Sequence, residues 1–190
     1  MIAYQRRDMT DGHIMDTTSL DLPEQTFTTQ AFWLALPQPV LEKAVANLQD
    51  GDEQATPGSL HAAEHALIAL LPLYAMCDRW DIGGLSTPWH WQTDAASIFV
   101  YDGYPGGIGL AKRGYEAFES LAADARALIA ECPCESGCPS CVQSPKCGNL
   151  NEPLSKGGAI ALLDAVLGRG ADPAGDDPPR AGDHKDDKGV

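Results

Sequence analysis

The chain has 190 residues, 44% of them hydrophobic, which is enough for one ordinary domain with a single core, and its longest apolar run is too short to span a bilayer. Lys and Arg number 13 against 27 Asp and Glu, so the formal net charge is −14 at pH 7. This charge disfavours nonspecific phosphate binding by the domain as a whole, because nucleic-acid affinity comes mainly from Lys and Arg, and any contact with DNA must be local.

The first part of the chain has a pattern of strands followed by helices. Three stretches, 2–7, 13–22 and 26–36, predict a small antiparallel sheet, the last being rich in Thr, Phe and Trp. Residues 37–50 have the pattern of an amphipathic helix. A second helix is expected from about 59 to 76, because its apolar residues recur at spacings of three and four and form one buried face.

The second half alternates irregular and regular segments. Residues 78–91 are expected to be irregular because they contain two glycines and a proline, and residues 96–101 to form a short apolar strand. The longest helix is expected at 108–130 and a closing helix at 155–167. From residue 169 to 190 the composition predicts an acidic, disordered tail.

Five of the six cysteines fall between residues 132 and 147, directly after the longest expected helix. Thiolates are soft ligands, so this loop predicts a metal site, with zinc as the default ion. The favoured ligands leave two to five residues between neighbours, whereas pairing Cys132 with Cys134 would take two ligands from alternate residues. We therefore expect one structural zinc on Cys134, Cys138, Cys141 and Cys147, with Cys132 as the alternative ligand.

A disulfide framework and an iron–sulfur cluster are the weaker alternatives for the cysteine loop. A disulfide framework requires an oxidising compartment, but residues 1–30 lack the apolar segment of an export signal and Cys77 stands alone. An iron–sulfur cluster is suggested by Cys134, Cys138 and Cys141, whose CxxxCxxC spacing matches that of radical enzymes. Those enzymes place the triad early in a barrel, whereas here it comes late, after a helix.

A glycine-rich turn at residues 97–111 follows the expected short strand and precedes a helix. Such a helix start exposes backbone N–H groups that bind anions, which makes Gly106, Gly107, Lys112 and Arg113 candidate contacts for DNA or another anion. The segment matches neither standard phosphate motif. A close strand-to-helix connection with no ligand is the alternative that we favour.

The sequence His61-Ala-Ala-Glu64-His65 matches HxxEH, the inverted zinc-protease motif. It suggests a stand-alone zinc hydrolase as a rival function, although so short a pattern arises easily by chance and needs a third ligand from elsewhere. A helix face with histidines packed near polar partners is the favoured interpretation. Trp80, Trp89 and Trp91 could stack on an unpaired base, but we expect a loop folded onto its own core.

Three stretches together resemble a known family: residues 97–111, the cysteine run 132–149, and Asn-Glu-Pro-Leu-Ser-Lys at 151–156. They look like the MrfA-type zinc-binding domain, which forms the C-terminal part of a group of superfamily 2 DEAD/DEAH-box DNA helicases linked to DNA repair. Residues 20–33 and the helix at 61–71 are similar to earlier parts of the same domain. The resemblance covers roughly residues 1–168.

The expected elements make an α+β domain over residues 1–168, in which a small antiparallel sheet packs with about four helices and a zinc loop at 132–150 lies between the last two helices. The resemblance implies zinc on four cysteines, mapped onto the favoured set, and ATP-dependent unwinding in the parent enzymes. The nucleotide-binding motifs of the motor are absent from the sequence, so we expect no ATP hydrolysis by this chain alone.

We expect the protein to be an accessory domain of a helicase. We expect it to be cytoplasmic and bacterial, and to be associated with the nucleoid as part of that helicase. The domain would position single-stranded or forked DNA against helicase motor domains that lie outside this sequence. A protein-interaction module that docks on a separate motor chain through its acidic surface is the third hypothesis. No membrane partner is expected.

Overall fold

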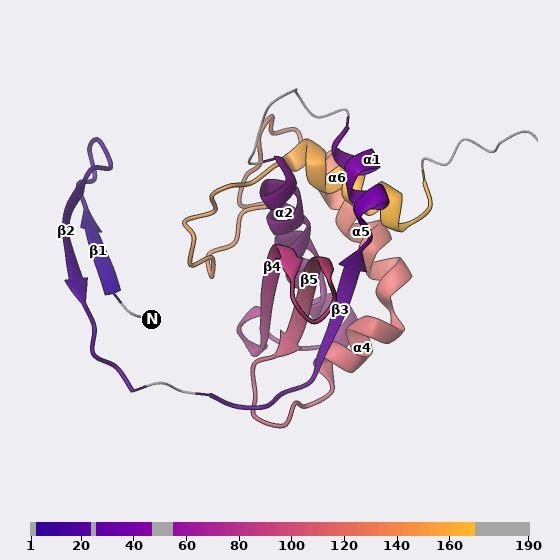
Figure 1. The fold of residues 1–190 in the computed structure, drawn as a ribbon, viewed down its shortest axis with the longest axis horizontal. Helices are drawn as coiled ribbons and strands as arrows, with labels where there is room; N and C mark the ends of the chain where they lie inside the picture. The colour runs from indigo at the N-terminus through magenta and orange to yellow at the C-terminus, as the bar shows by residue number, and fades with distance from the viewer. Residues whose placement is uncertain (1–2, 24–25, 47–54, 170–190) are drawn as a thin grey trace, which may run out of the picture.

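The computed structural model describes residues 3–23, 26–46 and 55–169, so the expected acidic tail lies outside the described residues except for Arg169, and the end of the helix expected at 37–50 is outside them too. The elements in chain order are β1 (Ala3–Arg7), β2 (Ile14–Ser19), β3 (Ala31–Leu36), α1 (Gln38–Val45), α2 (Ala55–Leu70), α3 (Pro72–Ala75), the 3-10 turn η1 (Arg79–Asp81), β4 (Ile82–His90), β5 (Ala95–Asp102), α4 (Leu110–Glu116), α5 (Phe118–Glu131) and α6 (Lys156–Val166) (Figure 1). The α+β class is confirmed. Among the described residues, no helix is both long and apolar enough to cross a membrane.

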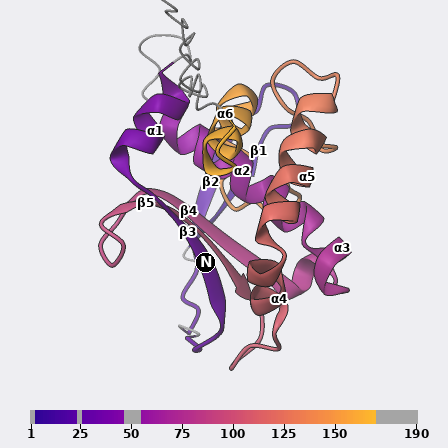
Figure 2. The same ribbon diagram turned by 90° about the vertical axis from the view of Figure 1, so that its right-hand side faces the viewer.

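The body is built on a three-stranded antiparallel sheet in the order β3-β5-β4. Ala96, Ile98 and Val100 of the central strand point to one side and are buried there. Helices gather on that side, as Figure 2 shows, whereas Trp33 and Leu85 on the outer strands are half exposed. Alternation of buried and exposed residues thus fixes which face of the sheet carries the core.

The first two strands form a separate hairpin, β1 with β2, that stands apart from the body (Figure 1). The prediction that the three N-terminal strands share one sheet is therefore wrong. The physical reason is burial: almost every residue of β1 and β2 is exposed, whereas β3 has alternating buried positions at Phe32 and Leu36. A strand without an apolar face gains little from joining the core sheet.

Helix α2 is the central element of the core. It packs against β4, α5 and α6, and residues 58–68 are all buried. Two glycines on neighbouring elements allow this close packing. A Cβ on Gly84 of β4 would lie 2.5 Å from a carboxylate oxygen of Glu64, and one on Gly158 of α6 would overlap the Ser59 side chain.

Two expectations for the second half were wrong. Residues 82–90, expected to be irregular, form β4, an edge strand that tolerates Pro88 because one side of an edge strand needs no hydrogen bonds. Trp80, Trp89 and Trp91 are 67%, 60% and 71% exposed, so this segment is not folded onto its own core.

The helix expected at 108–130 is interrupted between α4 and α5. The break falls at Ala117, whose φ of −104° and ψ of 12° leave the helical region. In α4, Gly114 faces Phe32 and Leu71, where a Cβ would be too close to both side chains. The division lets α4 pack against β3 and α5 pack against α2.

Candidate metal centre

The cysteine loop connects α5 to α6, as expected (Figure 1). Cys132 ends α5 with extended backbone angles, φ −69° and ψ 126°. Ser155 begins α6, and its hydroxyl oxygen accepts a hydrogen bond from the Gly158 N–H at 3.1 Å. Capping by Ser at this position satisfies one of the free N–H groups of the helix start and fixes where the loop ends.

Four cysteines of this loop bring their sulfur atoms together, each within 4.8 Å of the others: Cys132, Cys134, Cys138 and Cys141. The Sγ atoms of Cys132 and Cys138 are 3.5 Å apart, as are those of Cys134 and Cys141. A tetrahedron with zinc–sulfur bonds of 2.3 Å places its sulfurs about 3.8 Å apart. All six cysteines are free thiols, so the spacing fits a shared ion rather than disulfide bonds.

The backbone of the loop supports the sulfur atoms. The Cys138 N–H donates to Cys141 Sγ at 3.4 Å, and the Cys141 N–H donates to the Cys138 carbonyl at 3.0 Å. A hydrogen bond from the Ser140 N–H lowers the pKa of Cys138 to about 7, whereas burial raises the pKa of Cys141. A bound divalent cation favours the thiolate form of both side chains.

The ammonium group of Lys156 lies next to this cluster. Lys156 donates from Nζ to the carbonyls of Cys132 and Cys134, both at 2.6 Å. Four thiolates and a divalent ion carry a net charge of about −2, which a nearby ammonium group stabilises. Sequence reasoning missed Lys156 because its role depends on α6 folding back onto the loop.

The structure places Cys147 away from the other four. Its Sγ lies 3.3 Å from His61 Nε2, in a second group that consists of His61, His65 and Cys147. Lys146 accounts for the separation, because its Nζ donates to the carbonyls of Arg79 and Ile82 and so holds this part of the loop against the start of β4. The set expected from spacing, with Cys147 as fourth ligand, is therefore not the set that is brought together.

Cys132 is brought to the cluster by its extended backbone. Alternate residues of an extended chain point to the same side, so Cys132 and Cys134 can face one point despite the single residue between them. Spacing alone gives no backbone conformation for the CxC pair, and the end of α5 at Glu131 allows Cys132 to be extended.

The family model of the MrfA Zn-binding domain matches residues 63–142, a stretch that contains the four clustered cysteines and ends before Cys147. An uncharacterized protein of Methanocaldococcus jannaschii is 40% identical over 111 residues, which are 57% of this chain and 99% of that protein. The chain belongs to the MrfA zinc-binding domain family. The resemblance expected from the sequence is thereby confirmed.

Two longer relatives are helicases. The ATP-dependent helicase YprA of Bacillus subtilis is 34% identical over 142 residues, covering 73% of this chain and 18% of the helicase. The crystal structure of the DUF1998 helicase MrfA bound to DNA matches with a TM-score of 0.59 and 31% identity, over 87% of this chain and 20% of that one. The chain thus spans about a fifth of these relatives and corresponds to a zinc-binding accessory domain.

The N–H groups of the glycine-rich turn bind a carboxylate of the protein itself. The buried carboxylate of Asp102 accepts hydrogen bonds from four backbone N–H groups, at 2.5 to 3.2 Å, those of Ile108, Gly109, Leu110 and Ala111. The N–H groups of Gly106 and Gly107 donate to the carbonyls of Thr28 and Tyr104. The donors expected to bind an external anion are therefore used inside the domain.

Lys112 and Arg113 remain exposed next to this turn. Arg113 donates to the Tyr74 carbonyl at 3.2 Å and lies 3.6 Å from Glu116, whereas Lys112 lines a shallow groove between the edge strand β3 and α4. Trp33 and Tyr115, 58% and 70% exposed, also line this groove. Sequence reasoning missed these two aromatic residues because the groove forms only when α4 packs beside β3.

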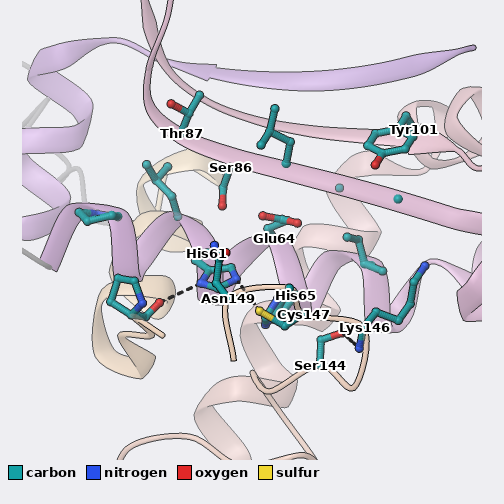
Figure 3. Close-up of a pocket in the computed structure, with 18 of the residues that line it drawn as sticks. His61, Glu64, His65, Ser86, Thr87, Tyr101, Ser144, Lys146, Cys147 and Asn149 are labelled. Carbon is teal, nitrogen blue, oxygen red and sulfur yellow. Dashed lines mark hydrogen bonds between the residues drawn. The ribbon is translucent and has the colours of Figure 1, made fainter. Parts of the chain in front are cut away.

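A separate cavity of about 340 Å³ lies between α2, β4 and the loop that carries Cys147 (Figure 3). His61, Glu64 and His65 project into it from α2, as the HxxEH spacing predicts. Burial lowers the pKa of His65 to about 4, so the ring is neutral near pH 7. Burial also raises the pKa of Glu64, which hydrogen-bonds with Ser86 on β4.

Proposed function

We propose that this domain binds one structural zinc ion through Cys132, Cys134, Cys138 and Cys141, and serves as the accessory domain of a DNA helicase. The observation that supports this proposal is the gathering of four sulfur atoms within 4.8 Å of one another, inside the segment matched by the MrfA Zn-binding domain. Four protein thiolates leave no position for water on zinc, so the ion would cross-link the loop and not catalyse a reaction.

Zinc would contribute much of the stability of this region. Structural zinc sites in small domains have apparent binding free energies of about 10–16 kcal/mol, comparable to the total stability of about 5–15 kcal/mol of a whole domain. The cluster lies between α5 and α6, both of which pack on α2. Removal of the ion would therefore loosen α5 and α6 together with the loop.

Elemental analysis of protein purified under reducing conditions tests the metal. We expect zinc, bound by the cysteine cluster and lost from that cluster when Cys132 is replaced by Ser. Iron with acid-labile sulfide would instead support the iron–sulfur alternative. A metal-free but fully folded protein would contradict the proposal altogether.

For the accessory role, we propose a local contact with single-stranded DNA in the groove between β3 and α4. Trp33 and Tyr115 offer aromatic faces for stacking bases, and Lys112 offers a cation for the backbone. This restricted contact is compatible with the net charge of −14. Motor domains outside this chain, in the bacterial cytoplasm and at the nucleoid, would supply ATP-dependent unwinding.

Titration of a single-stranded oligonucleotide at low and moderate salt tests the groove. Stacking of a base is worth about 1–3 kcal/mol, so Trp33→Ala should weaken binding by roughly 5- to 150-fold, and Lys112→Glu should weaken it further at low salt. Trp80→Ala is the control, because Trp80 is 67% exposed against 58% for Trp33 and does not line the groove. Absence of salt-sensitive binding would favour docking on a motor chain instead.

A further inference from the structure

We propose that His61, His65 and Cys147 form a second metal site, separate from the cysteine cluster, which holds a divalent ion such as zinc and keeps a coordination position open to the cavity in Figure 3. The motif HxxEH supplies two of these ligands. The third comes from the loop after the cysteine cluster and could not be identified from the motif.

The ligand atoms are close enough to share one ion. One nitrogen of each histidine and the sulfur of Cys147 lie within 4.8 Å of one another, and His61 Nε2 is 3.3 Å from Cys147 Sγ. A tetrahedral zinc ion with bonds of about 2.05 Å to nitrogen and 2.3 Å to sulfur places these two atoms about 3.5 Å apart. The geometry of the three side chains therefore needs little adjustment.

Both histidine rings are held in the orientation that metal ligands require. His61 Nδ1 lies 2.9 Å from the Pro153 carbonyl, and His65 Nδ1 lies 2.7 Å from the Val142 carbonyl. A carbonyl only accepts hydrogen bonds, so each Nδ1 carries the proton and each Nε2 presents a lone pair. This arrangement, a backbone carbonyl behind the ring, is the usual outer-shell support of histidine ligands.

The sulfur ligand is supported in a similar way. The Asn151 N–H donates to Cys147 Sγ at 3.3 Å, which favours the thiolate, and Asn151 Oδ1 accepts from the Ser144 N–H at 2.7 Å. These two hydrogen bonds close the segment between Ser144 and Asn151 into a compact loop. Cys147 is thereby held toward α2 by the backbone as well as by its contact with His61.

His61, His65 and Cys147 all line the cavity, so the remaining coordination position of an ion bound by them would face it. Figure 3 shows Glu64 between the two histidines and β4, with its carboxylate directed toward Ser86. Three protein ligands with an open position are the arrangement found in catalytic zinc sites, whereas closed sites use four. The second site would therefore accept an external ligand of small size, while the cysteine cluster would not.

A metal-free arrangement is the alternative, in which the Cys147 thiol simply donates a hydrogen bond to His61 Nε2. The two alternatives differ in stoichiometry. The metal site predicts that protein carrying one zinc per chain, in the cysteine cluster, binds one further equivalent of Co²⁺ with a sulfur-to-metal charge-transfer band, and the hydrogen bond predicts none. Binding of no further equivalent by the unmodified protein would overturn the proposal, without requiring any variant.

Variants then assign the ligands. Cys147→Ser should abolish the charge-transfer band, and His65→Ala should remove the further equivalent, while zinc in the cysteine cluster is retained and shows that both variants are folded. His90→Gln is the control, because this histidine packs on Phe99 and lies outside the group. Retention of the further equivalent with its band in Cys147→Ser would contradict the assignment.

Added azide tests the open position. It should shift the visible absorption of Co²⁺ in the second site and leave the zinc of the cysteine cluster in place. An unchanged spectrum would mean that the second site is closed. Zinc in the cysteine cluster without a further equivalent of Co²⁺ would contradict this inference alone, whereas a folded, unmodified protein with no metal in the cysteine cluster would contradict the proposed structural zinc.

Discussion

The two candidate metal-binding groups both use cysteines of the loop between α5 and α6, but they are assembled in different ways. The cysteine cluster takes all four residues from 132–141, so the chain closes it locally. The group of His61, His65 and Cys147 joins residues 86 positions apart and exists only after α2 has packed against the loop. A local group is visible in the sequence and contributes to folding, whereas a distant group depends on the fold that is already formed.

The largest effect is expected when a ligand of the cysteine cluster is removed. Cys141→Ser should release zinc and lower the melting temperature by more than about 10 °C, because each kcal/mol corresponds to roughly 2–4 °C in a domain of this size and several kcal/mol are lost. Differential scanning calorimetry with and without a chelator measures the effect. Cys77→Ser, outside both groups, is the control and should melt like the unmodified protein.

Close packing of α2 on β4 should affect the stability of the domain without affecting the cysteine cluster. Gly84→Ala places a Cβ against Glu64 and Ile68, which forces α2 away from β4 and should cost about 1–3 kcal/mol of stability. Denaturant unfolding measures this cost, and zinc in the cysteine cluster should be unaffected. Gly148→Ala, where a Cβ meets no atom within 4 Å, is the control. Loss of cluster zinc in Gly84→Ala would mean that the two groups are not independent.

The Lys156 ammonium group, which is not a ligand, should strengthen zinc binding by the cysteine cluster and have no effect on the second group. Lys156→Met removes the ammonium group from the carbonyls of Cys132 and Cys134 while keeping most of the side-chain volume, and should weaken zinc affinity by about 10- to 100-fold. Competition with a chromophoric chelator gives the affinity. Lys112→Met provides the matched control, since Lys112 is exposed and far from the loop in sequence.

The smallest effect is expected at Asn151, which supports only the second group. Asn151→Ala removes the acceptor for the Ser144 N–H at a residue with φ of 61°, and should cost about 1 kcal/mol. Asn151→Asp keeps an acceptor oxygen and should recover most of this stability. Urea unfolding of the three proteins makes the comparison, and equal losses in Ala and Asp variants would contradict the role given to the hydrogen bond.

Much of the fold was predictable because its signals are local. The cysteine loop between two helices, a helix in the region of α2 and the buried strand β5 follow from periodicity and spacing, although residues 58–68 of α2 are buried on all sides and not on one face. The strand β4 was missed because Gly83, Gly84 and Pro88 normally end strands, and here they allow close packing and an edge position. The partner of Cys147 could not be predicted, since it depends on contacts across 86 residues.

The Asp102 carboxylate occupies the N–H groups that a nucleic-acid phosphate could otherwise contact at the start of α4. Since this buried negative group already receives four N–H donors at the start of α4, a phosphate placed there would have to displace it and would be repelled meanwhile. We therefore expect an approaching polynucleotide to find no free N–H donor on Ile108, Gly109, Leu110 or Ala111.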